Sequence, residues 1–173
     1  MARQPLVILL TGAPAGGKST IARAFKAAFD ERFSNPVYWL ATDAIRRSFE
    51  CVDYSEPVKQ AIYDGMFAIG QGLNRAGCNL LLDANFIDET RLERFQELGN
   101  NGSTAITVLV RCDLATREER NRSRPETQQV DIAYLRKAHH IADEFAVNAD
   151  LLLDTENYSG DECAGRLLEF IGQ

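Results

Sequence analysis

Short apolar runs alternate with helical patterns along the chain. The first run, Leu6–Leu10, predicts a buried strand, and glycine-rich residues follow it. Further apolar runs predict four more strands, at 37–41, 79–83, 105–111 and a run that ends with 151–153. Apolar positions three or four residues apart predict helices through 21–29, 56–76, 88–98, 114–121, 130–146 and 160–171.

This alternation of strands and helices is typical of an α/β fold with a parallel sheet that helices cover on both faces. Ligands of such folds bind where the strands end, at the carboxyl edge of the sheet. We therefore expect the functional residues directly after the strands, at positions following 11, 42, 83, 111 and 154.

Composition and charge narrow the class of protein. The 173 residues amount to about one domain, spanning 1–173. The longest apolar run has five residues and Met1–Pro5 resembles no signal peptide, so we expect a cytoplasmic protein that does not interact with membranes. The net charge of −6 argues against a protein that coats nucleic acid. No pair of the four cysteines has CxxC spacing, which excludes zinc-site and thioredoxin-like readings.

The strongest motif follows the first strand and has the pattern G-x-x-x-x-G-K-S, which is typical of a phosphate-binding loop, or P-loop. Its glycines allow backbone N–H groups to surround an anion. Lys18 would bring a charge to the β- and γ-phosphates and Ser19 would offer a hydroxyl to Mg²⁺. The motif predicts that ATP binds with Mg²⁺ and that Lys18 is catalytic. The candidate nucleotide-binding residues are Gly12, Ala13, Pro14, Ala15, Gly16, Gly17, Lys18, Ser19 and Thr20.

Asp43 and Arg46 follow the second strand. A carboxylate at this point of the sheet edge could accept the proton of an acceptor hydroxyl during phosphoryl transfer. Asp43 could equally cap a helix, with Arg46 on its solvent face, and both roles could hold together. We keep Asp43 as candidate catalytic base and, with Arg46, as candidate substrate-binding residue.

Asp83 ends the third apolar strand, and Asn85 follows two residues later. A carboxylate in this position beside a P-loop is typical of Mg²⁺ binding, often through water, so Asp83 and Ser19 are the candidate metal ligands. Asp83 could instead be a turn residue. Asn85 could be a turn residue or a polar lining of the acceptor pocket.

Residues 117–124 contain four arginines, a local reversal of the acidic net charge, and Pro125 breaks any helix that runs through them. We call residues 117–129 the Arg-rich segment. Near phosphates, such a segment could act as a short lid that closes over the transferring group. The alternative is a solvated helical face with ion pairs between positions three or four apart.

These motifs occur in the order found in the small single-domain P-loop kinases, which include polynucleotide 5′-kinase, zeta toxin and chloramphenicol phosphotransferase. The chain resembles this family over nearly its whole length. The stretch 120–124 resembles the polynucleotide kinase lid, whereas Val110–Asp113 and Asp154-Thr155 resemble chloramphenicol phosphotransferase. Arg46 agrees with the polynucleotide kinase pattern and departs from the other one.

The resemblance implies a three-layer P-loop NTPase fold whose five parallel strands have the order 2-3-1-4-5. It implies that Arg46 holds the acceptor or its phosphate. It also implies that Arg120 contacts adenine or the phosphates, and that Arg124 stabilises the transition state. Residues 154–157 would border the base.

The sequence favours an ATP-dependent kinase that transfers the γ-phosphoryl group to a hydroxyl of a small molecule. Residues 43–64 contain three basic and five acidic side chains, which favours a neutral or cationic acceptor over nucleic acid. The alternatives are a polynucleotide 5′-hydroxyl kinase, a toxin-type sugar-nucleotide kinase, and a P-loop ATPase that acts as a conformational switch. The oligomeric state stays open.

Overall fold

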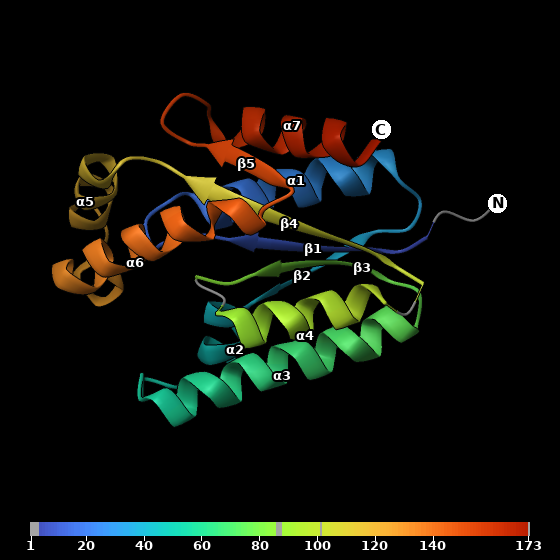
Figure 1. The fold of residues 1–173 in the computed structure, drawn as a ribbon, viewed down its shortest axis with the longest axis horizontal. Coiled ribbons are helices and arrows are strands. Elements are labelled where there is room, and N and C mark those ends of the chain that lie inside the picture. Colours follow the sequence, from blue (N-terminus) through green and yellow to red (C-terminus); the bar gives the residue numbers. More distant parts are fainter. Residues whose placement is uncertain (1–3, 86–87, 101, 173) are drawn as a thin grey trace.

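Five parallel strands form the centre of the fold, in the order β2-β3-β1-β4-β5 (Figure 1). The structure is a computed structural model that describes residues 4–85, 88–100 and 102–172. The strands are β1 (Leu6–Thr11), β2 (Val37–Ala41), β3 (Asn79–Asp83), β4 (Thr104–Arg111) and β5 (Leu151–Asp154). The predicted strands, their parallel pairing and their order are confirmed.

Helices cover both faces of this sheet, so the predicted three-layer arrangement is confirmed (Figure 1). α1 and α7 pack on one face, whereas α3, α4 and α6 pack on the other. The bounds are α1 (Lys18–Arg32), α2 (Thr42–Ser48), α3 (Glu56–Arg75), α4 (Glu89–Gly99), α5 (Leu114–Arg122), α6 (Ile132–Phe145) and α7 (Gly160–Gly172), with short 3₁₀ helices at Glu126–Gln128 and Ala146–Asn148.

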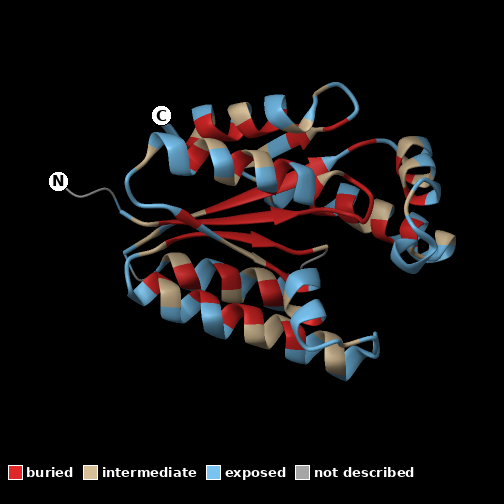
Figure 2. Cartoon of the chain, turned by 180° about the vertical axis from the view of Figure 1, so that it is seen from behind, coloured by how far each residue is buried: buried red, intermediate tan, exposed pale blue. Residues whose placement is uncertain are grey.

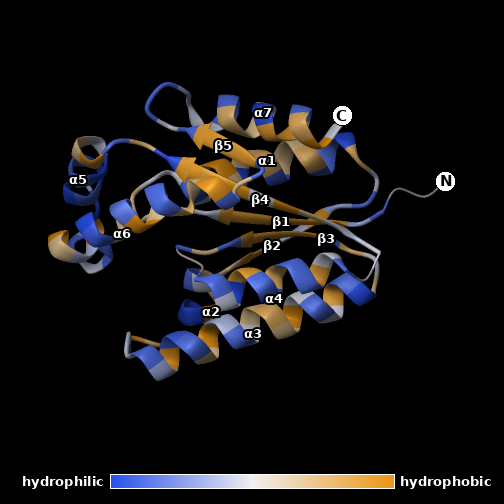
Figure 3. Cartoon of the chain, viewed as in Figure 1, coloured by the Kyte–Doolittle hydropathy of each residue, from blue (hydrophilic) through white to orange (hydrophobic). Residues whose placement is uncertain are grey.

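The central strand β1 is buried on both faces, which explains why it reads as a continuous apolar run. Successive side chains of a strand point to opposite faces. Accordingly, Ile8 and Leu10 join the core under α1 and α7, while Val7 and Leu9 join the core under α3 and α4. Figure 2 shows the buried residues concentrated in the sheet, and Figure 3 shows apolar strands between helices with hydrophilic outer faces.

The structure differs from the sequence-based prediction mainly after β2. The seven-residue helix α2 begins at Thr42, immediately after the strand, and is too short for an apolar period to reveal it. Residues 122–129, expected to be non-helical, contain the 3₁₀ turn Glu126–Gln128, which begins directly after Pro125. The bounds of the predicted helices differ from the observed bounds by a few residues at most, which is usual for frayed helix ends.

Within the described residues, no helix combines the length and the hydropathy that crossing a membrane would require. The cysteines are free thiols: Cys112 and Cys163 are buried, and Cys51 and Cys78 are partly exposed.

Candidate active site

The P-loop connects the end of β1 to the start of α1, at the carboxyl edge of the sheet (Figure 1). Its backbone enters the left-handed region at Gly12 (φ 141°), Ala15 (φ 58°) and Gly17 (φ 89°). A Cβ atom on Gly12 would lie 2.5 Å from the carbonyl oxygen of Val110 on β4, so only glycine fits there. Left-handed residues in such a turn expose successive N–H groups, which makes a concave anion site.

Lys18 is the first residue of α1 and is 6% exposed. Its ammonium group donates hydrogen bonds to the carbonyl oxygens of Gly12 (2.9 Å) and Ala13 (3.0 Å), within the same loop. Burial lowers the pKa of Lys18 to about 8, because the charged form loses its hydration. The lysine is therefore held inside the anion site by the loop itself.

Charged groups from three other elements act on Lys18. The carboxylates of Asp83, at the end of β3, and Asp43, on α2, oppose the fall of its pKa. The guanidinium of Arg124, from the Arg-rich segment, adds to the fall. The fold thus brings two other proposed catalytic residues, Asp43 and Arg124, within electrostatic reach of Lys18.

The hydroxyl of Ser19 donates a 3.0 Å hydrogen bond to Oδ2 of Asp83. Asp83 is 5% exposed and lies beside Leu10 in the register of β1 and β3. Burial raises the pKa of Asp83, and the charge of Lys18 and the bond from Ser19 oppose that rise. A hydroxyl and a carboxylate oxygen this close together are hard oxygen donors of the kind that Mg²⁺ prefers. These residues therefore fit the metal that the sequence implies.

Asp43 lies in the first turn of α2 and its side chain is exposed. The N-cap of this helix is Ala41, and no side chain caps it. The capping alternative therefore receives no support from the geometry, whereas the carboxylate is close enough to Lys18 and Asp83 to influence both pKa values. This placement agrees with the predicted base, and the role itself stays a prediction.

Arg46 is 7% exposed, and its side chain contacts the loop between α2 and α3. Its guanidinium donates to the carbonyl oxygen of Asp53, lies 3.5 Å from the thiol of Cys51, and stacks 4.3 Å from the centre of the Tyr54 ring. The acceptor-binding role of Arg46 stays a prediction, and in this structure the side chain is already engaged. Asn85 is partly exposed, next to residues 86 and 87, which lie outside the described part.

The arginines of the Arg-rich segment occupy three different environments. Arg117 is 1% exposed and donates to carbonyl oxygens of the P-loop, which differs from the solvated or mobile position that the sequence suggested. Arg120 donates to the hydroxyl (2.9 Å) and the carbonyl oxygen (2.7 Å) of Thr155. Arg124 is partly exposed, and its guanidinium forms no hydrogen bond or ion pair with any described residue. Unlike Arg117 and Arg120, Arg124 can therefore meet a ligand without breaking a side-chain contact to a described residue.

Thr155 follows β5 and joins the P-loop to α5. Its hydroxyl lies 2.9 Å from the carbonyl oxygen of Gly16 and 3.2 Å from that of Arg111, at the end of β4. The resemblance implies that Thr155 borders the base, but it does not predict this contact between Thr155 and the P-loop. Residues 16 and 155 are far apart in the sequence, so only the sheet order β1-β4-β5 brings them together.

A pocket of about 520 Å³ opens beside the P-loop. Its walls come from the P-loop and α1, from Arg120 and Arg124, and from the loop after β5. The lining residues are Ala15, Gly17, Thr20, Ile21, Arg120, Arg124, Thr155, Glu156, Asn157, Tyr158, Ser159 and Gly160. The volume and position of the pocket suit a nucleoside. The pocket is bordered by the P-loop, the two arginines and residues of the 154–157 loop to which the resemblance points.

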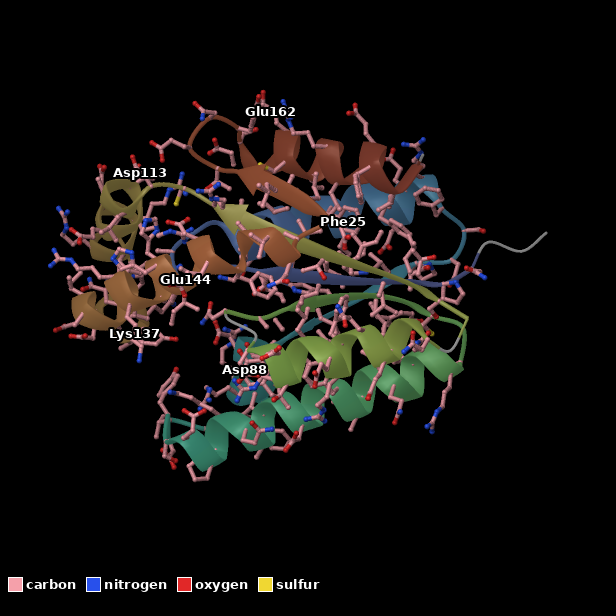
Figure 4. The ribbon with its side chains drawn as sticks, in the orientation of Figure 1. Phe25, Asp88, Asp113, Lys137, Glu144 and Glu162 are labelled. Carbon is pink, nitrogen blue, oxygen red and sulfur yellow. The ribbon has the colours of Figure 1, made fainter. Side chains whose placement is uncertain are left out.

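Tyr134, near the start of α6, is 44% exposed, and no sequence motif marks it. Desolvation raises its pKa, and the carboxylates of Asp43 and Glu56 add to the rise, so both carboxylates act on it electrostatically. Figure 4 shows the same edge with Asp88 and Asp113 at the starts of α4 and α5. No spacing signal marks Tyr134, because α6 reaches the site only through its packing on the sheet.

Solved structures with this fold include several kinases. The APS kinase of Mycobacterium tuberculosis, in complex with AMPPNP and APS, superimposes with a TM-score of 0.74 at 18% identity and covers 99% of this chain and 100% of its own. Shikimate kinase of Acinetobacter baumannii, in complex with shikimate, gives 0.66 at 18% identity, with 95% and 92% covered. Chaetomium thermophilum Kti12 with ADP-AlF3 gives 0.72 at 17%, with 96% and 97% covered.

No curated protein sequence matches the chain. A family model does: the model of the chloramphenicol phosphotransferase-like proteins matches residues 5–172, nearly the whole length. The chain therefore belongs to the chloramphenicol phosphotransferase-like family.

Proposed function

We propose that this protein is an ATP-dependent kinase that transfers the γ-phosphoryl group to a hydroxyl of a small-molecule acceptor. The observation that carries the proposal lies at one edge of the sheet, where Ser19 donates to Asp83 and the carboxylates of Asp83 and Asp43 act on the charge of Lys18. The family supports nucleotide-dependent phosphoryl transfer in general. Structural relatives solved with AMPPNP and with ADP-AlF3 support the nucleotide.

In the proposed reaction, each of these residues would have a separate role in phosphoryl transfer. The P-loop N–H groups and Lys18 bind the phosphates, and Arg124 approaches the transferring group from the Arg-rich segment. Asp43 orients the acceptor hydroxyl and accepts its proton as the oxygen attacks phosphorus. Ser19 and Asp83 would hold Mg²⁺, which neutralises charge on the phosphate oxygens when it is bound.

The acceptor side of the proposed site favours a neutral or cationic molecule. Arg46 lies three residues after Asp43 and is buried. Its guanidinium already contacts the loop at residues 51–54. The carboxylates of Asp43 and Glu56 act electrostatically on Tyr134. Residues 43–64 carry three basic and five acidic side chains, so an acceptor with several phosphates would meet a net negative charge. A nucleic-acid acceptor is therefore the less favoured alternative.

A panel of acceptors with γ-labelled ATP tests the proposal. It should contain amino sugars, aromatic diols, nucleosides, a 5′-hydroxyl oligonucleotide and a reaction without acceptor. We expect label to appear on one small alcohol, and to be lost in Lys18→Ala but kept in Lys137→Ala, which alters an exposed lysine on α6. Label that appears only as free phosphate would favour the ATPase switch, and label on the oligonucleotide would favour the polynucleotide kinase.

A further inference from the structure

Arg117 is the largest of the fully buried side chains in the described structure, and it is a cation. It lies in α5, 104 residues after Ala13 in the sequence, yet its guanidinium touches the P-loop. Solvation by water is not available to it, so its charge must be stabilised by the groups around it.

Four carbonyl oxygens surround the guanidinium. One nitrogen, Nη1, donates to Ala13 (3.0 Å) and Pro14 (3.1 Å) in the P-loop. Nη2 donates to Val110 (3.3 Å) on β4, and Nε donates to Cys112 (3.3 Å) just beyond it. Arg117 therefore fastens the P-loop to the end of β4.

These partners are dipoles and carry no net charge. No carboxylate of the described residues lies within ion-pair distance of Arg117. Cys112 and Asp143 attract it electrostatically, but Asp143 lies beyond ion-pair distance, is paired with Arg111 at 3.2 Å and lies 3.5 Å from His139. A buried charge without a counter-ion is costly, which makes this arrangement unusual for a purely structural arginine.

The position of the charge suggests what balances it. A Cβ atom on Gly16 would lie 2.6 Å from Nη1, so the guanidinium lies directly against the back of the P-loop. The same charge contributes to the low pKa of Lys18, so its field crosses the loop into the anion site. An anion in the loop would thus be attracted by Lys18 from within and by Arg117 from behind.

The contacts also orient the loop. In a trans peptide the C=O and N–H groups point in opposite directions, and the described chain contains no cis peptide bond. Because Arg117 binds the carbonyl oxygen of Pro14, the N–H of Ala15 in the same peptide points away from Arg117. Ala15 has φ 58°, a conformation that is unfavourable for alanine and that this contact helps to hold.

We infer that Arg117 is a positioning residue of the phosphate site: a buried second cation whose counter-ion is the nucleotide's phosphate chain, and which sets the P-loop N–H groups for that anion. The inference rests on the proposed function, because it assumes that a nucleotide phosphate occupies the loop. Arg117 touches the loop's carbonyl groups and not the substrate, so it acts through the loop and through its charge.

Inorganic tripolyphosphate is the probe that separates this role from recognition of the base. We expect Arg117→Gln, which removes the charge, to weaken tripolyphosphate binding at least tenfold by calorimetry. Arg117→Lys, which keeps the charge without the fork of donors, should recover more than half of that loss on a logarithmic scale. A merely structural arginine would not be rescued in affinity by lysine, since lysine cannot reach all four carbonyl groups.

Arg91→Gln is the matched control, because Arg91 is also buried but is paired with the carboxylate of Asp88 at 2.8 Å. Its tripolyphosphate affinity should stay within twofold of the wild type. A folded Arg117→Gln that binds tripolyphosphate as the wild type does would overturn the inference, as would an Arg117→Lys that loses as much affinity as Arg117→Gln. If the wild type binds neither tripolyphosphate nor ATP, the proposed function fails as well.

A measurement on the wild type decides the case if Arg117→Gln does not fold. The Nε–H group of Arg117 is buried and should give a slowly exchanging ¹⁵N resonance, which Arg117→Lys assigns by its absence. Saturation with tripolyphosphate should shift this resonance, while that of Arg91 should stay in place. A resonance of Arg117 that does not move would contradict a charge that responds to the bound anion.

Discussion

The guanidinium of Arg120 donates two hydrogen bonds to Thr155, one to its hydroxyl and one to its carbonyl oxygen. The same hydroxyl lies 2.9 Å from the carbonyl oxygen of Gly16, so one threonine connects α5 to the P-loop. Arg120 is consequently fixed at the wall of the pocket, whereas Arg124, four residues later, keeps its guanidinium available. The two arginines should respond differently to substitution.

Thr155→Val should destabilise the protein and weaken ATP binding, because it leaves buried polar partners without their hydroxyl. Loss of such a hydrogen bond costs about 1–3 kcal/mol, which corresponds to roughly 2–4 °C in Tm per kcal/mol for a chain of this size. Differential scanning calorimetry and ATP titration measure both effects. Thr116→Val, which removes an exposed hydroxyl bonded to Glu156, is the control and should change neither value appreciably. If Thr155→Val and Thr116→Val had the same Tm and the same ATP affinity, a stabilising contact of Thr155 between α5 and the P-loop would be contradicted.

Arg124→Ala should lower kcat far more than it weakens ATP binding. Its guanidinium faces the pocket without a partner among the described residues, so it is available for charge that develops during phosphoryl transfer. Comparing kcat with the directly measured Kd for ATP tests this. Arg122→Ala, an exposed arginine of the same segment, should have little effect on either. Equal losses of kcat and affinity in Arg124→Ala would make it a simple nucleotide-binding residue.

Asp43→Asn should reduce phosphoryl transfer by about 10²–10⁴-fold, the usual contribution of a general base, with ATP affinity nearly unchanged. The side chain does not cap α2, so its conversion to asparagine should alter Tm little. Asp161→Asn changes an acidic residue in the first turn of α7 and serves as the control. A normal rate in Asp43→Asn would remove the base from the mechanism and favour the ATPase switch.

ATP affinity should fall as the pH rises above about 8. The pKa of Lys18 is lowered from 10.5 to about 8 in the folded protein, so its charge is lost in this range while the unfolded chain still holds the proton. Ligand-free stability should therefore gain from Lys18 as the pH rises from about 8 to 10.5, whereas binding of phosphate, which needs the charged lysine, should weaken.

Titrations of ATP at about pH 7.5 and 9.5 should differ by roughly tenfold or more if Lys18 governs binding. Lys18→Met should bind weakly at both pH values and lose the dependence. An affinity of the wild type that is flat across this range would show that the charge of Lys18 does not limit binding.

The sheet and the P-loop could be predicted from the sequence, because each has a local sequence pattern. A continuous apolar run such as Leu6–Leu10 marks a strand buried on two faces, and the G-x-x-x-x-G-K-S spacing marks the loop. Asp83 could be placed because it ends such a run.

What could not be read from the sequence depends on tertiary contacts. An arginine next to two glutamates reads as a solvated residue, and only the packing of α5 against the P-loop buries Arg117. The resemblance points to Thr155, but its bridge to the P-loop comes only from the sheet order, and no motif marks Tyr134. Helix α2 has no detectable apolar period, because seven residues hold too few turns to display one.

The strand order has a consequence for how this protein could change its substrate. β1 and the P-loop occupy the middle of the edge, so the segments near Asp43 come from β2 and β3 on one side, and the pocket comes from β4 and β5 on the other. Under the proposed function, separate stretches of the chain would therefore bind the phosphate donor and the acceptor. We expect that substitutions between α2 and α3 can change the acceptor while the nucleotide half keeps its contacts, so the two specificities would be separable in evolution and in design.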